Sequence, residues 1–110
     1  MSLNFKHKRG DTFEAVDFEL TINEVAVNLS DTIIRMQLRK EYGGVIALNL
    51  TSVDDAGITI TDAVNGLFKI NEQVINIDAC KYLYDIQFDF DGEIKTYISG
   101  EFLITNDVTR

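Results

Sequence analysis

Apolar and polar residues alternate along most of the chain with the two-residue period of β-strands. Successive side chains of a strand point to opposite faces of a sheet, so this alternation marks strands with one buried face and one wet face. Turn signals separate the strands about every 8 to 12 residues, which is typical of a β-sandwich or barrel. A helix fits in only one place, as a single short turn within residues 71–78. The alternating segments are residues 16–22, 34–38, 46–50, 58–60, 68–70, 82–90 and 94–104.

The last two segments predict a β-hairpin that turns at Asp91-Gly92. A two-residue loop would place the inward residue Phe90 opposite the outward residue Glu93. A three-residue loop that ends with Gly92 in the left-handed conformation keeps inward residues opposite one another, and we therefore predict this loop. A tyrosine ring would then cover the bare backbone of a strand glycine. The expected pairs are Phe88 with Ile94, Tyr84 with Ile98 and Tyr82 with Gly100.

The start of segment 82–90 carries a pattern known from immunoglobulin-like domains. Asp78 to Tyr84 is similar to the Asp-x-Gly-x-Tyr-x-Cys pattern of their sixth strand, where the tyrosine hydroxyl hydrogen-bonds to upstream backbone. Tyr82 would be this corner tyrosine, with Cys80 in place of the glycine and Tyr84 in place of the disulfide cysteine. The alternative is ordinary alternation that includes a tyrosine. The predicted fold is all-β, an immunoglobulin-like sandwich of about seven to eight antiparallel strands without the disulfide.

Composition places the chain among ordinary globular proteins. Of its 110 residues, 45% are hydrophobic and 25% are charged, which predicts a single domain over residues 1–110 with a flexible leader at residues 1–10. Ten Lys and Arg against 18 Asp and Glu give a net charge of −8. A negative surface repels phosphate and anionic lipid, so we expect neither nucleic acid nor membrane as a partner. The sequence shows no secretion signal, and its one cysteine fits synthesis in a reducing cytosol.

Residues that could carry catalysis or bind a metal are few. His7 is the only histidine and lies in the polar leader, so no Ser-His-Asp or Cys-His arrangement can be proposed. Cys80 has only Lys81 as an adjacent cation and is interpreted as the replacement of a small turn residue. The acidic residues at 54–55 and 89–93 lack the spacing of an EF-hand and fit turns better than calcium sites. We therefore predict a protein that is not an enzyme and has no cofactor and no metal.

Two features of the sequence suggest contacts with other proteins. Leu83, Tyr97 and Leu103 interrupt the polar face of the last hairpin, and a contiguous patch there would form an interaction face. The open edges of a sandwich are a further place where a partner strand could add. Arg9-Gly10-Asp11 matches the integrin-binding tripeptide, but Gly10 is better explained as a turn between the leader and the first strand.

Four stretches of the chain carry a family resemblance: residues 8–13, 27–39, 82–88 and 95–109. Their most specific parts are the Arg-Gly-Asp-Thr-Phe start and the closing Gly-x-Phe-x-Ile-Thr-x-Asp-Val-Thr. The stretches resemble small virion proteins of tailed bacteriophages. They are similar to the amino-terminal domain of upper baseplate proteins and to related head, neck and tail accessory domains. Cys80 departs from the small glycine usual in this family.

The resemblance implies an immunoglobulin-like assembly module without an active site. Such a module would dock to other virion proteins of the baseplate, tail, neck or head, as a homo-oligomer, after synthesis in the bacterial host cytoplasm. An alternative is a carbohydrate- or receptor-binding module, for which Tyr42 and Tyr97 are the candidate exposed aromatic residues. A third possibility is an enzyme or an inhibitor of a host enzyme, for which the polar constellation is missing.

Overall fold

The computed structural model describes residues 2–41 and 44–106. Within these ranges the protein has twelve strands, one short 3-10 turn at Val53–Asp55 and no α-helix. The all-β prediction is therefore confirmed.

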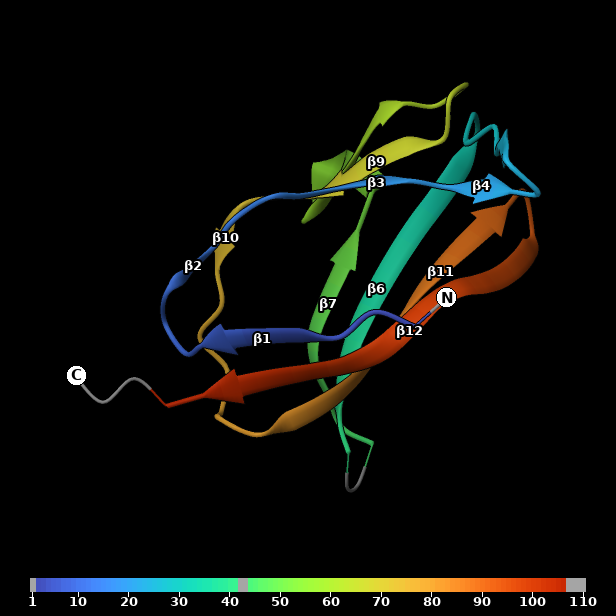
Figure 1. The fold of residues 1–110 in the computed structure, drawn as a ribbon. Coiled ribbons are helices and arrows are strands. Elements are labelled where there is room, and N and C mark those ends of the chain that lie inside the picture. The colour runs from blue at the N-terminus through green and yellow to red at the C-terminus, as the bar shows by residue number, and fades with distance from the viewer. Residues whose placement is uncertain (1, 42–43, 107–110) are drawn as a thin grey trace.

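Five strands form the main sheet, in the order β1-β12-β11-β6-β7 (Figure 1). The sheet is mixed, because β1 runs parallel to β12 whereas all other neighbours are antiparallel. It curls into the shape of half a barrel. The strands are β1 (Phe5–Lys8), β12 (Glu93–Thr105), β11 (Lys81–Phe90), β6 (Thr32–Lys40) and β7 (Ile46–Thr51).

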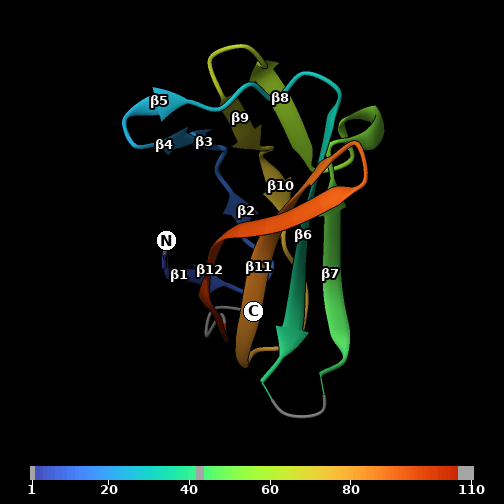
Figure 2. The ribbon, with the colours of Figure 1, turned by 90° about the vertical axis from the view of Figure 1, so that its right-hand side faces the viewer.

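Shorter strands form a second layer over the concave side of the main sheet (Figures 1 and 2). Its largest part is a three-stranded antiparallel sheet in the order β3-β9-β8. Residues 71–78, where a helical turn was considered, contain β10 instead, and β10 pairs with β2. The strands are β2 (Thr12–Phe13), β3 (Val16–Glu19), β4 (Thr21–Ile22), β5 (Val25–Ala26), β8 (Ile58–Asp62), β9 (Leu67–Ile70) and β10 (Gln73–Val74).

The core lies between the two layers and is built from the alternating apolar residues. On β6 and β11 every second residue is buried over most of the strand, as the two-residue period requires. Phe68 of β9 meets Phe88 of β11 edge to face, with ring centroids 5.5 Å apart, so aromatic rings join the layers. Burial of each such side chain stabilises the fold by about 1.5–3 kcal/mol. The largest buried side chains are Tyr82, Phe68, Phe88, Phe102, Leu29, Ile34, Met36, Leu38, Ile58, Ile70, Ile86 and Ile104.

The β11–β12 hairpin closes through a two-residue loop, so the predicted three-residue loop is wrong. Phe90 pairs with Glu93, and the two loop residues Asp91 and Gly92 have φ values of 55° and 100°. Positive φ at both positions is typical of a type I′ turn. The left-handed conformation predicted for Gly92 is confirmed, and its N–H donates to Asp89 Oδ1 over 2.7 Å.

With this loop alone, inward-facing residues of β11 would lie opposite outward-facing residues of β12. A β-bulge in β12 brings inward-facing residues opposite one another again. Ile86 pairs with Ile98 but Gln87 pairs with Thr96, so Tyr97 is the extra residue of β12. Each of the three predicted cross-strand pairs is therefore wrong. The observed pairs are Phe88 with Lys95, Tyr84 with Gly100 and Tyr82 with Phe102, and Ile94 is 57% exposed.

The prediction of a flexible leader over residues 1–10 is wrong for residues 5–8, which form β1. This strand pairs with the last strand, β12, from Phe5 opposite Phe102 to Lys8 opposite Thr105. Phe5 stacks on Phe102 with ring centroids 5.2 Å apart, which anchors the segment on the core. Its alternation covers only four residues, Phe-Lys-His-Lys, and so gave too weak a signal.

The hairpin of β4 and β5 projects from one end of the molecule (Figure 2). Ile22 pairs with Val25 around a two-residue loop, in which Asn23 and Glu24 have φ values of 52° and 66°. The alternation over residues 16–22 predicts a single strand and gives no sign of this turn, because Asn-Glu lacks the glycine usual in such loops.

Candidate functional site

We call the side of the main sheet that faces away from the second layer the outer face. Two apolar residues are exposed near its centre: Leu83 on β11 and Leu103 on β12, with exposed fractions of 45% and 38%. Leu83 pairs with Glu101 and Leu103 pairs with Lys81, so the two leucines are diagonal neighbours on paired strands. Such neighbours lie about 7–8 Å apart. The structure thus brings together two of the three residues predicted to form an interaction face.

The third predicted residue, Tyr97, lies on the other side of the sheet. The bulge turns its side chain inward, where its ring lies 5.6 Å from that of Phe88 between centroids. There it lines a groove of about 250 Å³ between β12 and the β3–β4 segment, together with Phe18, Leu20 and Ile98. Tyr97 is therefore not part of the outer face. Tyr42, the other aromatic residue considered for carbohydrate binding, lies outside the described residues.

Charged side chains surround the two leucines on the outer face. Register places Lys6 beside Leu103, and Arg39 beside Leu83. Ile46, 45% exposed, follows Arg39 in the same row. The charged residues on the outer face are Lys6, Lys8, Arg35, Arg39, Glu41, Lys81, Asp85, Asp89 and Glu101.

Some of these charges are neutralised within the face. Lys81 Nζ lies 3.0 Å from Glu101 Oε1 and 3.7 Å from Glu41 Oε2, and the hydrogen bond to Glu101 is the main cause of its raised pKa. Arg35 forms an ion pair with Asp89, in which Nη1 lies 3.5 Å from Oδ2. Lys6, Lys8 and Arg39 have no carboxylate within ion-pair distance among the described residues. The outer face therefore keeps free positive charge, although the whole protein is acidic.

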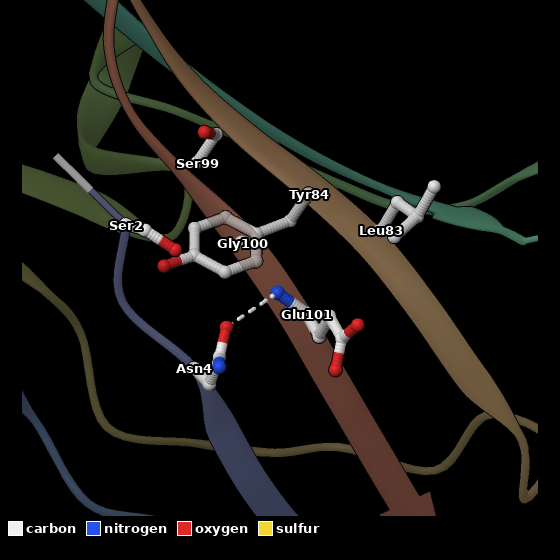
Figure 3. Close-up of a pocket in the computed structure, with 7 residues that line it drawn as sticks. All are labelled: Ser2, Asn4, Leu83, Tyr84, Ser99, Gly100 and Glu101. Carbon is white, nitrogen blue, oxygen red and sulfur yellow. Dashed lines mark hydrogen bonds between the residues drawn. The ribbon is translucent and has the colours of Figure 1, made fainter.

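A shallow hollow of about 430 Å³ opens on the outer face beside Leu83 (Figure 3). Its floor is at Gly100, where an added Cβ would overlap the carbonyl oxygen of Leu3 and lie 2.9 Å from Asn4 Oδ1. Gly100 thus allows the backbone of residues 2–4 to approach β12 closely. Gly100 was predicted to pair with Tyr82, but it pairs with Tyr84, and it also makes room for residues 2–4.

Hydrogen bonds around Gly100 fasten residues 2–4 to the sheet. The Leu3 N–H donates to the Ser99 carbonyl over 3.0 Å, and the Glu101 N–H donates to Asn4 Oδ1 over 3.0 Å. The Tyr84 ring extends from β11 across β12 at Gly100 (Figure 3). Its hydroxyl donates to the Leu3 carbonyl. Burial raises the pKa of Tyr84 to about 12. The pairing across such a distance in sequence left no signal by which these residues could have been predicted.

Tyr82 makes the hydrogen bond predicted for a corner tyrosine. Its hydroxyl donates to the backbone carbonyl of Asp78 over 2.6 Å, and the ring is fully buried. Burial is the main cause of the raised pKa of Tyr82, and Cys80 and Asp78 act in the same direction. A phenol so placed stays neutral and acts as a structural donor.

The other candidate residues take structural positions. His7 Nε2 lies 2.9 Å from the Asp11 carbonyl, at the turn that contains Arg9-Gly10-Asp11. In this turn, Arg9 Nη2 lies 3.9 Å from Asp78 Oδ1. The Gly10 N–H donates to the Ile75 carbonyl. Cys80 is a partly buried free thiol.

Neither a cluster of metal ligands nor a membrane-spanning helix occurs in residues 2–41 and 44–106. No group of three or more His, Cys, Asp or Glu side chains there could hold a metal ion. No helix in that part of the chain is long and apolar enough to span a membrane.

Comparison of the chain with models of known protein families finds no match, and comparison with curated proteins finds none either.

Proposed function

We propose that the protein is a structural module of a tailed-phage virion that binds other virion proteins through its outer face. The resemblance of residues 8–13, 27–39 and 82–88 to virion proteins supports this role. Residues 107–109 of the fourth stretch lie outside the described residues. The observation that carries the proposal is the pair of exposed leucines, Leu83 and Leu103, among free cations on a sheet face. Exposed apolar groups within a charged rim are typical of a protein contact.

An immunoglobulin-like sandwich is the finer fold that we propose. In such domains the sheets have the strand orders ABED and CFG, with an additional strand C′ beside C in variable-type domains. If β3, β6, β7, β8, β9, β11 and β12 correspond to B, C, C′, D, E, F and G, the order β3-β9-β8 matches B-E-D. The order β12-β11-β6-β7 then matches G-F-C-C′. The hydrogen bond of Tyr82 at the start of β11 also supports this assignment.

Two measurements test the proposed function. Mass spectrometry of purified phage particles should detect this chain. Pull-down with the purified chain should retain virion proteins encoded beside its reading frame. Leu83→Glu places a carboxylate in the centre of the outer face and should weaken that binding at least about tenfold, which corresponds to 1.4 kcal/mol.

The matched control is Val74→Glu, which changes an exposed valine of β10 outside the outer face. It should bind as the unchanged protein does. The proposal fails if the chain is missing from purified particles, or if both variants bind equally well.

A further inference from the structure

The outer face and the β4–β5 end of the molecule differ in charge. The outer face holds five of the ten Lys and Arg residues of the chain but only four of the 18 Asp and Glu residues. Its net charge is therefore positive on a protein whose total charge is −8. The remaining surface must be strongly acidic, and the β4–β5 end is one part of it.

We call the β4–β5 hairpin and the adjoining β8–β9 turn the distal end. These two segments are joined by backbone hydrogen bonds: Leu20 N–H to the Gly66 carbonyl over 2.9 Å, and Leu29 N–H to the Ala63 carbonyl over 2.7 Å. Figure 2 shows both at the same end of the molecule, away from the β6–β7 turn.

The distal end combines exposed apolar side chains with acidic ones. Ile22, Val25 and Val64 are 43%, 68% and 65% exposed. Glu19 and Glu24 are exposed beside them and have no cation within ion-pair distance in the part of the chain that the structure describes. An apolar tip with free negative charge is complementary to the outer face, which has apolar residues with free positive charge.

We propose that copies of this chain associate head to tail, with the distal end of one copy bound to the outer face of the next. The apolar tip would sit on Leu83, Leu103 and the hollow beside them, while Glu19 and Glu24 face cations such as Arg39 and Lys6. Contact between two outer faces would instead bring like charges together. This assignment rests on the proposed function in one respect, because both use the outer face as the binding surface.

A head-to-tail contact has a consequence that a two-fold contact lacks. Each contact uses two different patches, so an open assembly keeps one free outer face at one end and one free distal end at the other. The assembly therefore closes into a ring or grows into a fibre. Destroying one patch leaves the other able to bind. Two variants with different defective patches should therefore complement each other.

The test measures mass by light scattering after size exclusion, with full-length protein. Unchanged protein should increase in mass as its concentration is raised. Leu83→Glu removes the outer-face patch and Val25→Asp removes the distal-end patch, so each variant alone should remain monomeric at these concentrations. An equimolar mixture should form a 1:1 complex, because one intact patch of each kind remains.

Controls keep each outcome interpretable. Val74→Glu lies outside both patches and should assemble as the unchanged protein does. Leu103→Glu and Ile22→Asp replace the first pair of variants if circular dichroism shows that either of those is unfolded. The proposal is overturned if the unchanged protein is monomeric throughout, if either single variant still assembles, or if the mixture stays monomeric.

Binding of the same variants to neighbouring virion proteins separates this proposal from the proposed function. A monomeric protein that still binds those proteins through Leu83 contradicts the head-to-tail contact only. A protein that assembles but binds no virion protein contradicts the proposed function only.

Discussion

Replacing Gly100 by alanine tests whether the close approach of residues 2–4 to β12 stabilises the fold. The backbone of Gly100 is not left-handed, so alanine meets no conformational strain of its own. The added methyl group would instead overlap the Leu3 carbonyl oxygen and press on Asn4 Oδ1. Both contacts are with residues 2–4, which must move away from the sheet.

The cost follows from the hydrogen bonds that this movement breaks. Leu3 takes part in two, with the Ser99 carbonyl and the Tyr84 hydroxyl, and Asn4 Oδ1 accepts a third. Each contributes about 0.5–1.5 kcal/mol, and alanine returns about 0.4–1 kcal/mol by restricting the unfolded chain. We therefore expect the free energy of unfolding to fall by about 0.5–4 kcal/mol.

Urea denaturation followed by circular dichroism measures this change, with Ser99→Ala as the control on the same strand. A double-mutant cycle identifies its cause, because Gly100→Ala and Tyr84→Phe disturb the same contact. The double variant should therefore lose less unfolding free energy than the sum of the losses of the two single variants. The reasoning is refuted if Gly100→Ala is as stable as the unchanged protein, or if the two effects are fully additive.

Three further predictions concern stability. Tyr82→Phe removes the hydrogen bond to Asp78 and should lower the unfolding free energy by about 1–2 kcal/mol in urea denaturation, with unchanged binding. Burial raises the pKa of Tyr84 to about 12, above the value of about 10 in the unfolded chain. The contribution of Tyr84 to stability should therefore be constant below about pH 10 and fall between about pH 10 and 12, where absorbance at long ultraviolet wavelength reports phenolate formation. Glu24→Gly relieves a φ of 66° and should raise stability by up to about 1 kcal/mol in thermal unfolding.

The strands could be predicted from the sequence because burial on one face imposes a two-residue period. The β11 segment shows this directly: Tyr82, Tyr84, Ile86 and Phe88 are all buried, as their alternation predicted. Their burial depends only on local spacing and on the presence of a covering layer. The corner hydrogen bond of Tyr82 was also predictable, because donor and acceptor are only four residues apart.

The register of β11 against β12 could not be predicted, because one extra residue in β12 shifts the pairing by one position. Tyr97 forms a bulge, and without knowledge of it the agreement of faces in the last hairpin favoured the wrong loop. The bulge also places the side chain of Tyr97 on the inner side of the sheet and not on the expected interaction face. Leu83 and Leu103 were placed correctly because they lie beyond the bulge, where the alternation resumes.

The contacts of residues 2–8 are beyond the reach of local patterns. Glu101 and Asn4, joined by a hydrogen bond, are 97 positions apart, and a parallel pairing leaves no turn signal between the two strands. Asn4 and Leu3 carried no feature that distinguished them from a solvated leader.

The parallel pairing of β1 with β12 bears on how the chain is made. A ribosome releases β1 long before it has synthesised the strand that β1 must join. Until Phe102 has been synthesised and released, Phe5 therefore lacks the ring on which it stacks. Proteins dominated by such distant pairings fold slowly, in about milliseconds to seconds. A nascent chain that waits with an apolar strand uncovered is a natural client for ribosome-associated chaperones.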